Sequence, residues 1–198
     1  MTGIVIVDKP AGWTSQDVTA RLRRVFGTRR IGHGGTLDPM ATGVLPVFVG
    51  RATRGVEFFE HADKTYEAVL RLGTVTDTQD STGAVLEKRP TAVTEAEFRD
   101  ILPKFTGKIA QVPPMYSAIK VDGKKLYELA RAGKEVERKP REITIFSLEL
   151  LEFSGETAKI RVHCSKGTYI RTLCHDIGAA LGCGGCMETL RRTAERAF

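Results

Sequence analysis

The residues best suited to chemistry lie in one glycine-rich segment, residues 32–43. Its sequence, GHGGTLDPMATG, contains four glycines and one proline, so we predict a tight loop without helix or strand. Asp38 lies between Leu37 and Pro39, and Pro39 restricts it to an extended backbone while the glycines allow a ligand to approach closely. A carboxylate among apolar neighbours has a raised pKa unless a cation compensates. Spacing alone leaves two roles open: a catalytic carboxylate, or a side chain that caps a turn.

Hydrophobic periodicity predicts the elements that must hold this loop. Thr14 and Asp17 form a capping-box pattern before apolar residues at helical spacing, and Gly27 ends that helix. Thr94 and Glu97 begin a second capped helix. Strands and helices do not alternate strictly, which favours an α+β fold with a mixed sheet over a doubly wound one. The other predicted elements are strands at residues 4–7, 44–49, 66–72, 84–87, 143–153 and 158–164, and helices at 126–132 and 168–181.

Length and composition are those of an ordinary globular protein. The 198 residues, 41% hydrophobic and 27% charged, can form one core, or one domain with an insertion. No apolar stretch is long enough to span a membrane, and the first residues lack the features of a secretory signal. We therefore expect a cytoplasmic protein.

The placement of basic residues is more informative than their total. The net charge is +6; residues 18–37 hold five arginines and no acid, and residues 120–141 hold eight basic and four acidic residues. In a compact fold these segments could form one face that binds phosphates. Ordinary solvated surfaces are the alternative.

The cysteines offer a second candidate chemistry. Cys183 and Cys186 have a spacing compatible with zinc or a redox pair, but no second close pair accompanies them. His163 and Cys164 are adjacent, and a strand would point them to opposite faces, which argues against a zinc-dependent hydrolase. We expect reduced thiols and no metal.

The loop sequence GHGGTLDPMATGVLP resembles the catalytic loop of the bacterial tRNA pseudouridine-55 synthases. Four further blocks resemble motifs of that family in the same order, so that the resemblance runs from Asp8 to Thr193. This agreement favours a catalytic role for Asp38 over a turn cap. The blocks are VDKPAGWTS, DKTYEAVLRLGTVTDTQDSTG, PPMYSAIKVDGKKLYELARAG and HCSKGTYIRTLCHDIGAALG, followed by LRRT, which resembles the family's closing helix.

The resemblance implies an isomerase that converts uridine to pseudouridine at position 55 in the T-loop of tRNA, by base flipping and aspartate catalysis. It also implies the pseudouridine synthase fold, a mixed, largely antiparallel central sheet flanked by helices. No electrons or external groups move in this reaction, so we expect no cofactor, and the chain has no GxGxxG or Walker loop. The expected partner is the T-stem-loop of tRNA, bound by a monomer. A pseudouridine synthase acting on another RNA and a non-catalytic tRNA-binding module are the alternatives.

The resemblance also assigns roles to individual residues, each of which has core packing or a solvated position as its ordinary alternative. Arg171 is the cation expected to keep Asp38 ionised, and Tyr66 is expected to stack on the extruded base. These three residues form the predicted catalytic set. The predicted substrate-binding residues are His33, which takes space vacated by flipped nucleotides; Tyr169 and Leu190, which line the uracil pocket; Lys9 and Asp80, near the site; and Lys64, a phosphate contact or a solvated lysine.

One catalytic domain is expected over residues 1–198, with a basic RNA-contacting insertion at about residues 113–141. Family members usually continue into a C-terminal RNA-binding domain of the PUA type, which we expect to be absent because the chain stops at Phe198. Within residues 184–187 the family often has Ala-His where this chain has Gly-Cys. We expect this departure to alter a local RNA contact and to leave the aspartate unaffected.

Overall fold

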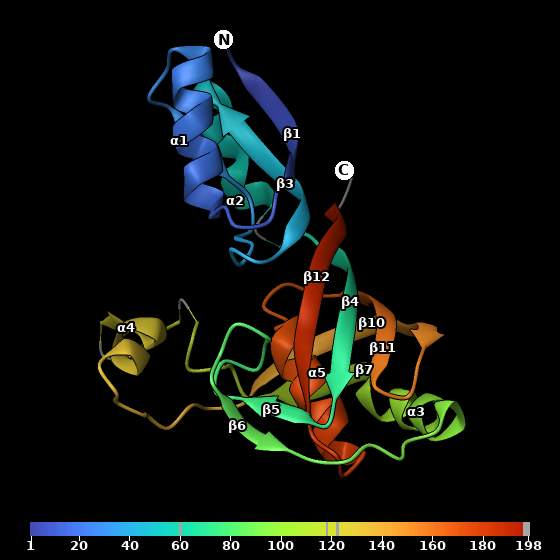
Figure 1. Ribbon diagram of the computed structural model, residues 1–198. Helices are drawn as coiled ribbons and strands as arrows, with labels where there is room; N and C mark the ends of the chain where they lie inside the picture. Colours follow the sequence, from blue (N-terminus) through green and yellow to red (C-terminus); the bar gives the residue numbers. More distant parts are fainter. Residues whose placement is uncertain (60, 118, 122, 196–198) are drawn as a thin grey trace.

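The computed structural model describes residues 1–59, 61–117, 119–121 and 123–195 (Figure 1). Its described residues form an eight-stranded sheet with the order β1-β3-β12-β4-β11-β10-β7, and β2 pairs with β3. All neighbouring strands are antiparallel except β12 and β3, which run parallel. The predicted mixed, largely antiparallel α+β fold is confirmed. The strands are β1 (Gly3–Lys9), β2 (Ile31–His33), β3 (Thr42–Val49), β4 (Lys64–Leu72), β7 (Gly107–Gln111), β10 (Arg141–Phe153), β11 (Thr157–Cys164) and β12 (Gly185–Glu195).

The N-terminal lobe is built on β1 and β3, which helix α1 (Ser15–Phe26) covers (Figure 1). The predicted capping box is present: the Thr14 hydroxyl accepts from the Asp17 N–H at 3.0 Å, and Gly27 ends the helix with φ 60°. A small core of apolar side chains, including Val18, lies between helix and strands. After β3 the chain makes a 3-10 turn, η1 (Gly50–Gly55), and a short helix, α2 (Val56–Phe59).

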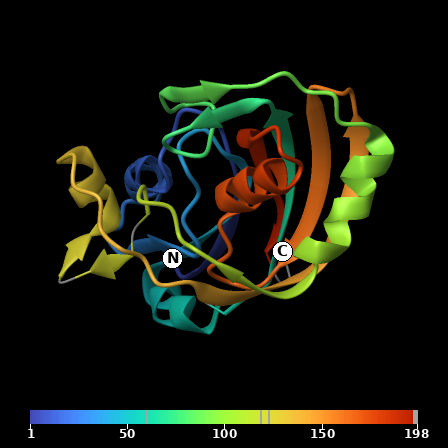
Figure 2. The same cartoon turned by 90° about the horizontal axis from the view of Figure 1, so that it is seen from below.

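The second lobe holds the larger core, and the long strands β4 and β12 connect the two lobes (Figure 1). Helix α5 (Ile170–Ala180) lies inside the curve of the sheet (Figure 2) and packs against β12. The elements around it are α3 (Glu95–Ile101), the 3-10 turn η2 (Leu102–Phe105), and a separate hairpin of β5 (Thr74–Thr76) and β6 (Val85–Lys88).

The segment between β7 and β10 leaves the sheet, because these two strands pair directly with each other. It carries the hairpin of β8 (Lys120–Val121) and β9 (Lys124–Lys125) and the helix α4 (Leu126–Arg131). In Figure 1 this segment stands apart from the body of the second lobe.

Two expectations about elements are wrong. Residues 190–193, expected to be a closing helix, belong to β12, a central strand in which burial alternates: Leu190 and Arg192 are buried, and Arg191 is exposed. A strand is required there because β12 fills the sheet between β3 and β4. The glycine-rich loop also contains regular structure at both ends, since β2 extends to His33 and β3 begins at Thr42. In the described part of the chain, no helix is long and apolar enough to cross a membrane.

Candidate active site

Asp38 lies in the irregular part of the loop, residues 34–41. The preceding residue, Leu37, is buried, and its N–H donates to the Ser15 hydroxyl at 3.0 Å. The same hydroxyl donates to the Leu37 carbonyl at 3.3 Å. After the aspartate, the Ala41 N–H donates to the Asp38 carbonyl at 3.0 Å. The beginning of α1 therefore fixes the backbone directly before the carboxylate.

Lys9, fully buried at the end of β1, supports the other side of the loop. Its ammonium group donates to the carbonyls of Pro10 at 2.9 Å, Trp13 at 2.6 Å and Pro39 at 3.2 Å. Burial lowers the pKa of Lys9, and the charge of Asp38 opposes that shift. Lys9 thus lies next to the catalytic candidate, as expected, with its three donors directed at backbone carbonyls.

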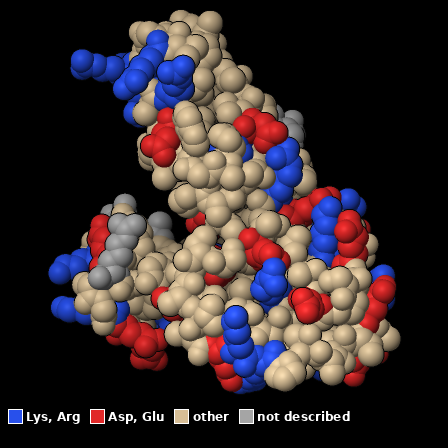
Figure 3. Space-filling view, viewed as in Figure 1, with Lys and Arg blue, Asp and Glu red and all other residues tan. Residues whose placement is uncertain are grey.

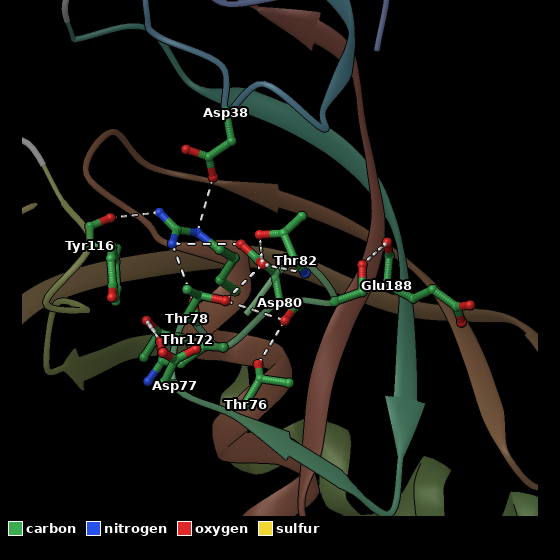
Figure 4. Close-up of polar contacts among 12 residues, drawn as sticks. Asp38, Thr76, Asp77, Thr78, Asp80, Thr82, Tyr116, Thr172 and Glu188 are labelled. Atoms are coloured by element: carbon green, nitrogen blue, oxygen red, sulfur yellow. Dashed lines mark hydrogen bonds and ion pairs between the residues drawn. The ribbon is translucent and has the colours of Figure 1, made fainter. Parts of the chain in front are cut away.

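Arg171 is the second residue of α5 and is almost fully buried. Its Nε lies 3.0 Å from Asp38 Oδ2, an ion pair that places the expected cation beside the aspartate. Its Nη2 donates to the Tyr116 carbonyl at 2.9 Å and its Nη1 to the Thr78 carbonyl at 3.3 Å, while Nη1 lies 3.7 Å from Asp80 Oδ2 (Figure 4). One rigid guanidinium therefore joins the aspartate loop, the turn after β5 and the start of the insertion.

Asp80 is held so that one carboxylate oxygen faces Arg171. Its Oδ1 accepts from the Thr78 hydroxyl at 2.8 Å, the Thr82 N–H at 2.9 Å and the Thr82 hydroxyl at 2.6 Å. Oδ2 is the atom directed toward the guanidinium. Asp80 thus lies beside the same arginine as Asp38 and faces a different nitrogen of it (Figure 4).

The protonation of Asp38 depends on a balance of burial and charge. Burial raises the pKa of its carboxyl, and the charge of Asp80 adds to this rise, while Arg171 and Lys9 oppose it. The Asp38 side chain keeps 36% exposure, so a ligand can reach it. The α5 N-terminus lines the same pocket, and such a helix end favours negative charge. The carboxylate is thus reachable, yet less solvated than an ordinary surface aspartate.

Asp38 and Arg171 lie at a pocket of about 110 Å³. Its lining includes Tyr66, Tyr169 and Leu190, which are the three residues expected to surround a base. Tyr66 is buried, and burial raises the pKa of its phenol to about 12, so the hydroxyl stays protonated at neutral pH. The structure therefore brings these predicted residues together with the carboxylate.

A second, wider cavity of about 740 Å³ adjoins the same pair. It shares Asp38, Tyr169 and Arg171 with the small pocket, and it extends to Tyr116 and Ser117 at the start of the insertion. The insertion therefore forms part of the wall around the candidate carboxylate.

Two expected substrate-binding residues lie farther from this centre. The Lys64 ammonium donates to the Ala62 carbonyl at 2.8 Å and lies 3.4 Å from Glu195 Oε1, so it is ion-paired and mostly buried instead of freely solvated. His33 is on β2, where its Nε2 lies 3.4 Å from Gln16 Nε2. Burial lowers the pKa of His33, and the Arg192 charge lowers it further. Among the described residues, His33 is absent from the linings of both cavities that contain Asp38.

Sequence reasoning missed two residues that hold the site. Gln111, buried at the end of β7, accepts from the Tyr169 N–H at 2.8 Å and donates to the Tyr169 carbonyl at 3.0 Å. Arg192, buried in β12, contacts the ends of the aspartate loop. No local signal marks Arg192, because three polar residues follow Leu190 and the alternation of burial in β12 is not visible in the sequence itself.

The cysteines show no metal-site geometry in the parts of the chain that the structure describes. All four are free and buried, and no group of three His, Cys, Asp or Glu residues gathers there. Burial raises the pKa of Cys164 to about 11, which keeps this thiol protonated.

Comparisons with known proteins show to which family the chain is related. Residues 23–170 match the profile described as "TruB family pseudouridylate synthase (N terminal domain)", and residues 171–198 match "tRNA pseudouridylate synthase B C-terminal domain". The chain is 54% identical over 192 residues to tRNA pseudouridine synthase B of Azoarcus sp. (strain BH72), covering 97% of this chain and 64% of that protein. It is 51% identical to the protein of the same name from Pseudomonas fluorescens (strain Pf0-1), covering 100% of this chain and 65% of that one.

A solved structure is also similar to this chain over nearly its full length. A chain of the "Crystal Structure of a Cbf5-Nop10-Gar1 Complex" superposes with a TM-score of 0.77 at 36% identity, covering 98% of this chain and 48% of that one. The present chain spans 64–65% of the length of the two tRNA pseudouridine synthase B proteins named above. The profile match over residues 23–170 and the identity above 50% lead to one conclusion. This chain belongs to the TruB family of pseudouridylate synthases.

Proposed function

We propose that this chain isomerises uridine to pseudouridine at position 55 in the T-loop of tRNA, with Asp38 as the catalytic carboxylate and without a cofactor. The observation that carries the proposal is the ion pair between Asp38 Oδ2 and Arg171 Nε, 3.0 Å apart at the wall of a pocket of about 110 Å³. The names of the relatives, tRNA pseudouridine synthase B, support the same substrate class.

The reaction requires little from the protein beyond placement and one reactive group. The N1–C1′ bond of uridine breaks, the base turns, and a C5–C1′ bond forms, while C5 loses a proton and N1 gains one. Atoms and electrons balance without a redox partner. A carboxylate can act as nucleophile at the sugar or at the base, or can assist the elimination. The Asp38 side chain is 36% exposed at the pocket, so a bound uridine can contact it, and Arg171 stabilises its charged form.

The size of the pocket fits a single flipped base. Sites for drug-sized ligands have volumes of roughly 300–1,000 Å³, and the pocket of about 110 Å³ is far smaller. Tyr66, Tyr169 and Leu190 supply flat and apolar surface for one pyrimidine ring. The sugar and the rest of the loop then lie in the adjoining cavity of about 740 Å³. An enzyme acting on a base inside a folded loop must extrude that base.

The basic segments supply sequence-independent attraction for the RNA backbone. Figure 3 shows Lys and Arg side chains over the N-terminal lobe and over the protruding insertion on the same side of the molecule. Lys124, Lys134 and Lys139 of the insertion are exposed. Contacts of this kind position RNA and carry no sequence information.

The direct test is incubation of the chain with a T-stem-loop RNA whose uridines carry tritium at C5. We expect tritium release at one uridine per RNA and a pseudouridine at the corresponding position. Release from a different loop would assign the chain to another RNA substrate. RNA binding without any release would assign it to a non-catalytic binding role.

A further inference from the structure

Arg192 is fully buried at the junction of the two lobes. It lies on β12 directly between two elements of the site: its neighbour across the parallel pair is Gly43 of β3, and its neighbour across the antiparallel pair is Tyr66 of β4. A Cβ atom at Gly43 would come within 2.0 Å of the Arg192 carbonyl oxygen, so glycine is required for this close approach. Arg192 thus touches both the loop that carries Asp38 and the tyrosine of the pocket.

The guanidinium of Arg192 binds the two ends of the aspartate loop. Its Nη2 donates to the Gly35 carbonyl at 3.0 Å, and its Nε donates to the Val44 carbonyl at 2.7 Å. Gly35 precedes Asp38, and Val44 follows it in β3. One side chain therefore closes the loop at its base, while Ser15 and Lys9 hold the residues directly before and after Asp38.

A buried acid holds the guanidinium in place. Glu195 Oε2 lies 3.3 Å from Arg192 Nη2, and both side chains have no exposed surface. Lys64 lies 3.4 Å from the other oxygen of Glu195. Removing one partner of a buried ion pair leaves an uncompensated buried charge, so this pair favours a single position of the arginine. Burial raises the pKa of the Tyr66 phenol, and the positive charge of Arg192 lowers it and so opposes that rise.

We propose that Arg192 is a positioning residue, whose forked contact with the Gly35 and Val44 carbonyls sets where Asp38 stands relative to the pocket. This inference rests on the proposed function and concerns a residue whose hydrogen bonds go to the loop backbone on either side of Asp38. The planar fork of an arginine is needed, because a lysine has one compact ammonium group and cannot keep both contacts in this geometry. Lysine would, however, retain the charge that Glu195 requires.

The test is Arg192→Lys, with Arg191→Lys as the matched control. Arg191 is the adjacent residue of the same strand, but its side chain is 49% exposed and pairs with Asp8 on the other face. We expect Arg192→Lys to lower kcat at least 30-fold, with KM for the T-stem-loop RNA within threefold and Tm within a few degrees. Arg191→Lys should leave kcat, KM and Tm unchanged.

A second readout does not need activity. Hydrogen exchange should be at least tenfold faster in Arg192→Lys for the peptide covering residues 34–45, and unchanged for peptides of β10. Wild-type activity and loop exchange in the lysine variant would overturn the positioning role. If the wild type released no tritium, the proposed function would fail, while the exchange result would still decide whether Arg192 orders the loop.

A further variant serves if Arg192→Lys does not fold. Glu195→Gln keeps the arginine and its carbonyl contacts but removes the charge that orients the guanidinium. We expect kcat to fall at least fivefold at unchanged KM, together with faster exchange of residues 34–45. A Glu195→Gln variant with wild-type kcat and exchange would contradict the proposal.

Discussion

Asp38 and Asp80 share the Arg171 guanidinium: Asp38 Oδ2 lies 3.0 Å from its Nε, and Asp80 Oδ2 lies 3.7 Å from its Nη1. One cation therefore serves two carboxylates, and their mutual repulsion raises the pKa of Asp38. Asp80 is fixed by Thr78 and Thr82, whereas Asp38 has substantial exposure. Of the two carboxylates, Asp38 is the one that a substrate can reach.

Replacement of Asp38 should separate chemistry from binding. We expect Asp38→Asn and Asp38→Ala to lower kcat by about 10³-fold or more, with tRNA affinity within about tenfold, because the phosphate-binding surfaces are unchanged. Tritium release measures the first quantity and filter binding the second. Substantial turnover by Asp38→Ala would remove the aspartate mechanism.

The same substitution should not destabilise the fold at neutral pH. The pKa of Asp38 is raised in the folded state, so the folded protein binds more protons than the unfolded chain between the unfolded and folded pKa values. Stability therefore falls as pH rises through that window. Asp38→Asn removes this cost, and we expect its Tm at pH 7 to equal or exceed that of the wild type, with the advantage disappearing below the unfolded pKa. A lower Tm at pH 7 would show that the Arg171 contact outweighs burial.

Activity should fall in acid as Asp38 becomes protonated, and Asp80 should determine where. The negative charge of Asp80 raises the pKa of Asp38. In Asp80→Asn that contribution is absent, so we expect the acid limb of the single-turnover rate to move to lower pH, even if the maximal rate falls. Asp77→Asn is the control, because it removes the same charge from the same turn at a carboxylate that accepts from the Ala84 N–H and does not pair with Arg171. An acid limb that moved to higher pH would contradict this electrostatic account.

Local patterns were sufficient to predict much of the fold and less of the site. The helix from Ser15 to Phe26 follows from its cap and its apolar spacing, and the ion pair of Asp38 and Arg171 follows from the family motifs. The strand β7, whose side chains are partly exposed, has no comparable local signal. Arg192 escaped prediction because nothing local shows that an arginine is buried by two other strands.

Tyr66 should act through its ring. Stacking on a base contributes about 1–3 kcal/mol, so we expect Tyr66→Leu to lower kcat/KM by roughly 5- to 150-fold relative to Tyr66→Phe. The two variants differ mainly in the aromatic face, because neither has the hydroxyl. Single-turnover rates with T-stem-loop RNA measure the difference. Equal rates for Leu and Phe would exclude a stacking platform at this position.

The insertion should contribute charge and little sequence recognition. Lys124, Lys134 and Lys139 are exposed on it, and each phosphate contact adds about 0.7–0.9 to the slope of log K against log salt. We expect substitution of all three by glutamine to make this slope shallower by about 2, and to weaken binding of cognate and scrambled stem-loops equally.

The matched control for this salt dependence is substitution of Lys88, Lys104 and Lys108 by glutamine, three lysines that are exposed on β6, η2 and β7, outside the insertion. These lysines carry the same charge on a different surface, so a change in net charge alone would affect both sets alike. A localised RNA contact requires that only the insertion variant lose slope. If both sets changed the slope equally, the attraction would come from the overall charge of +6 and not from a docked insertion.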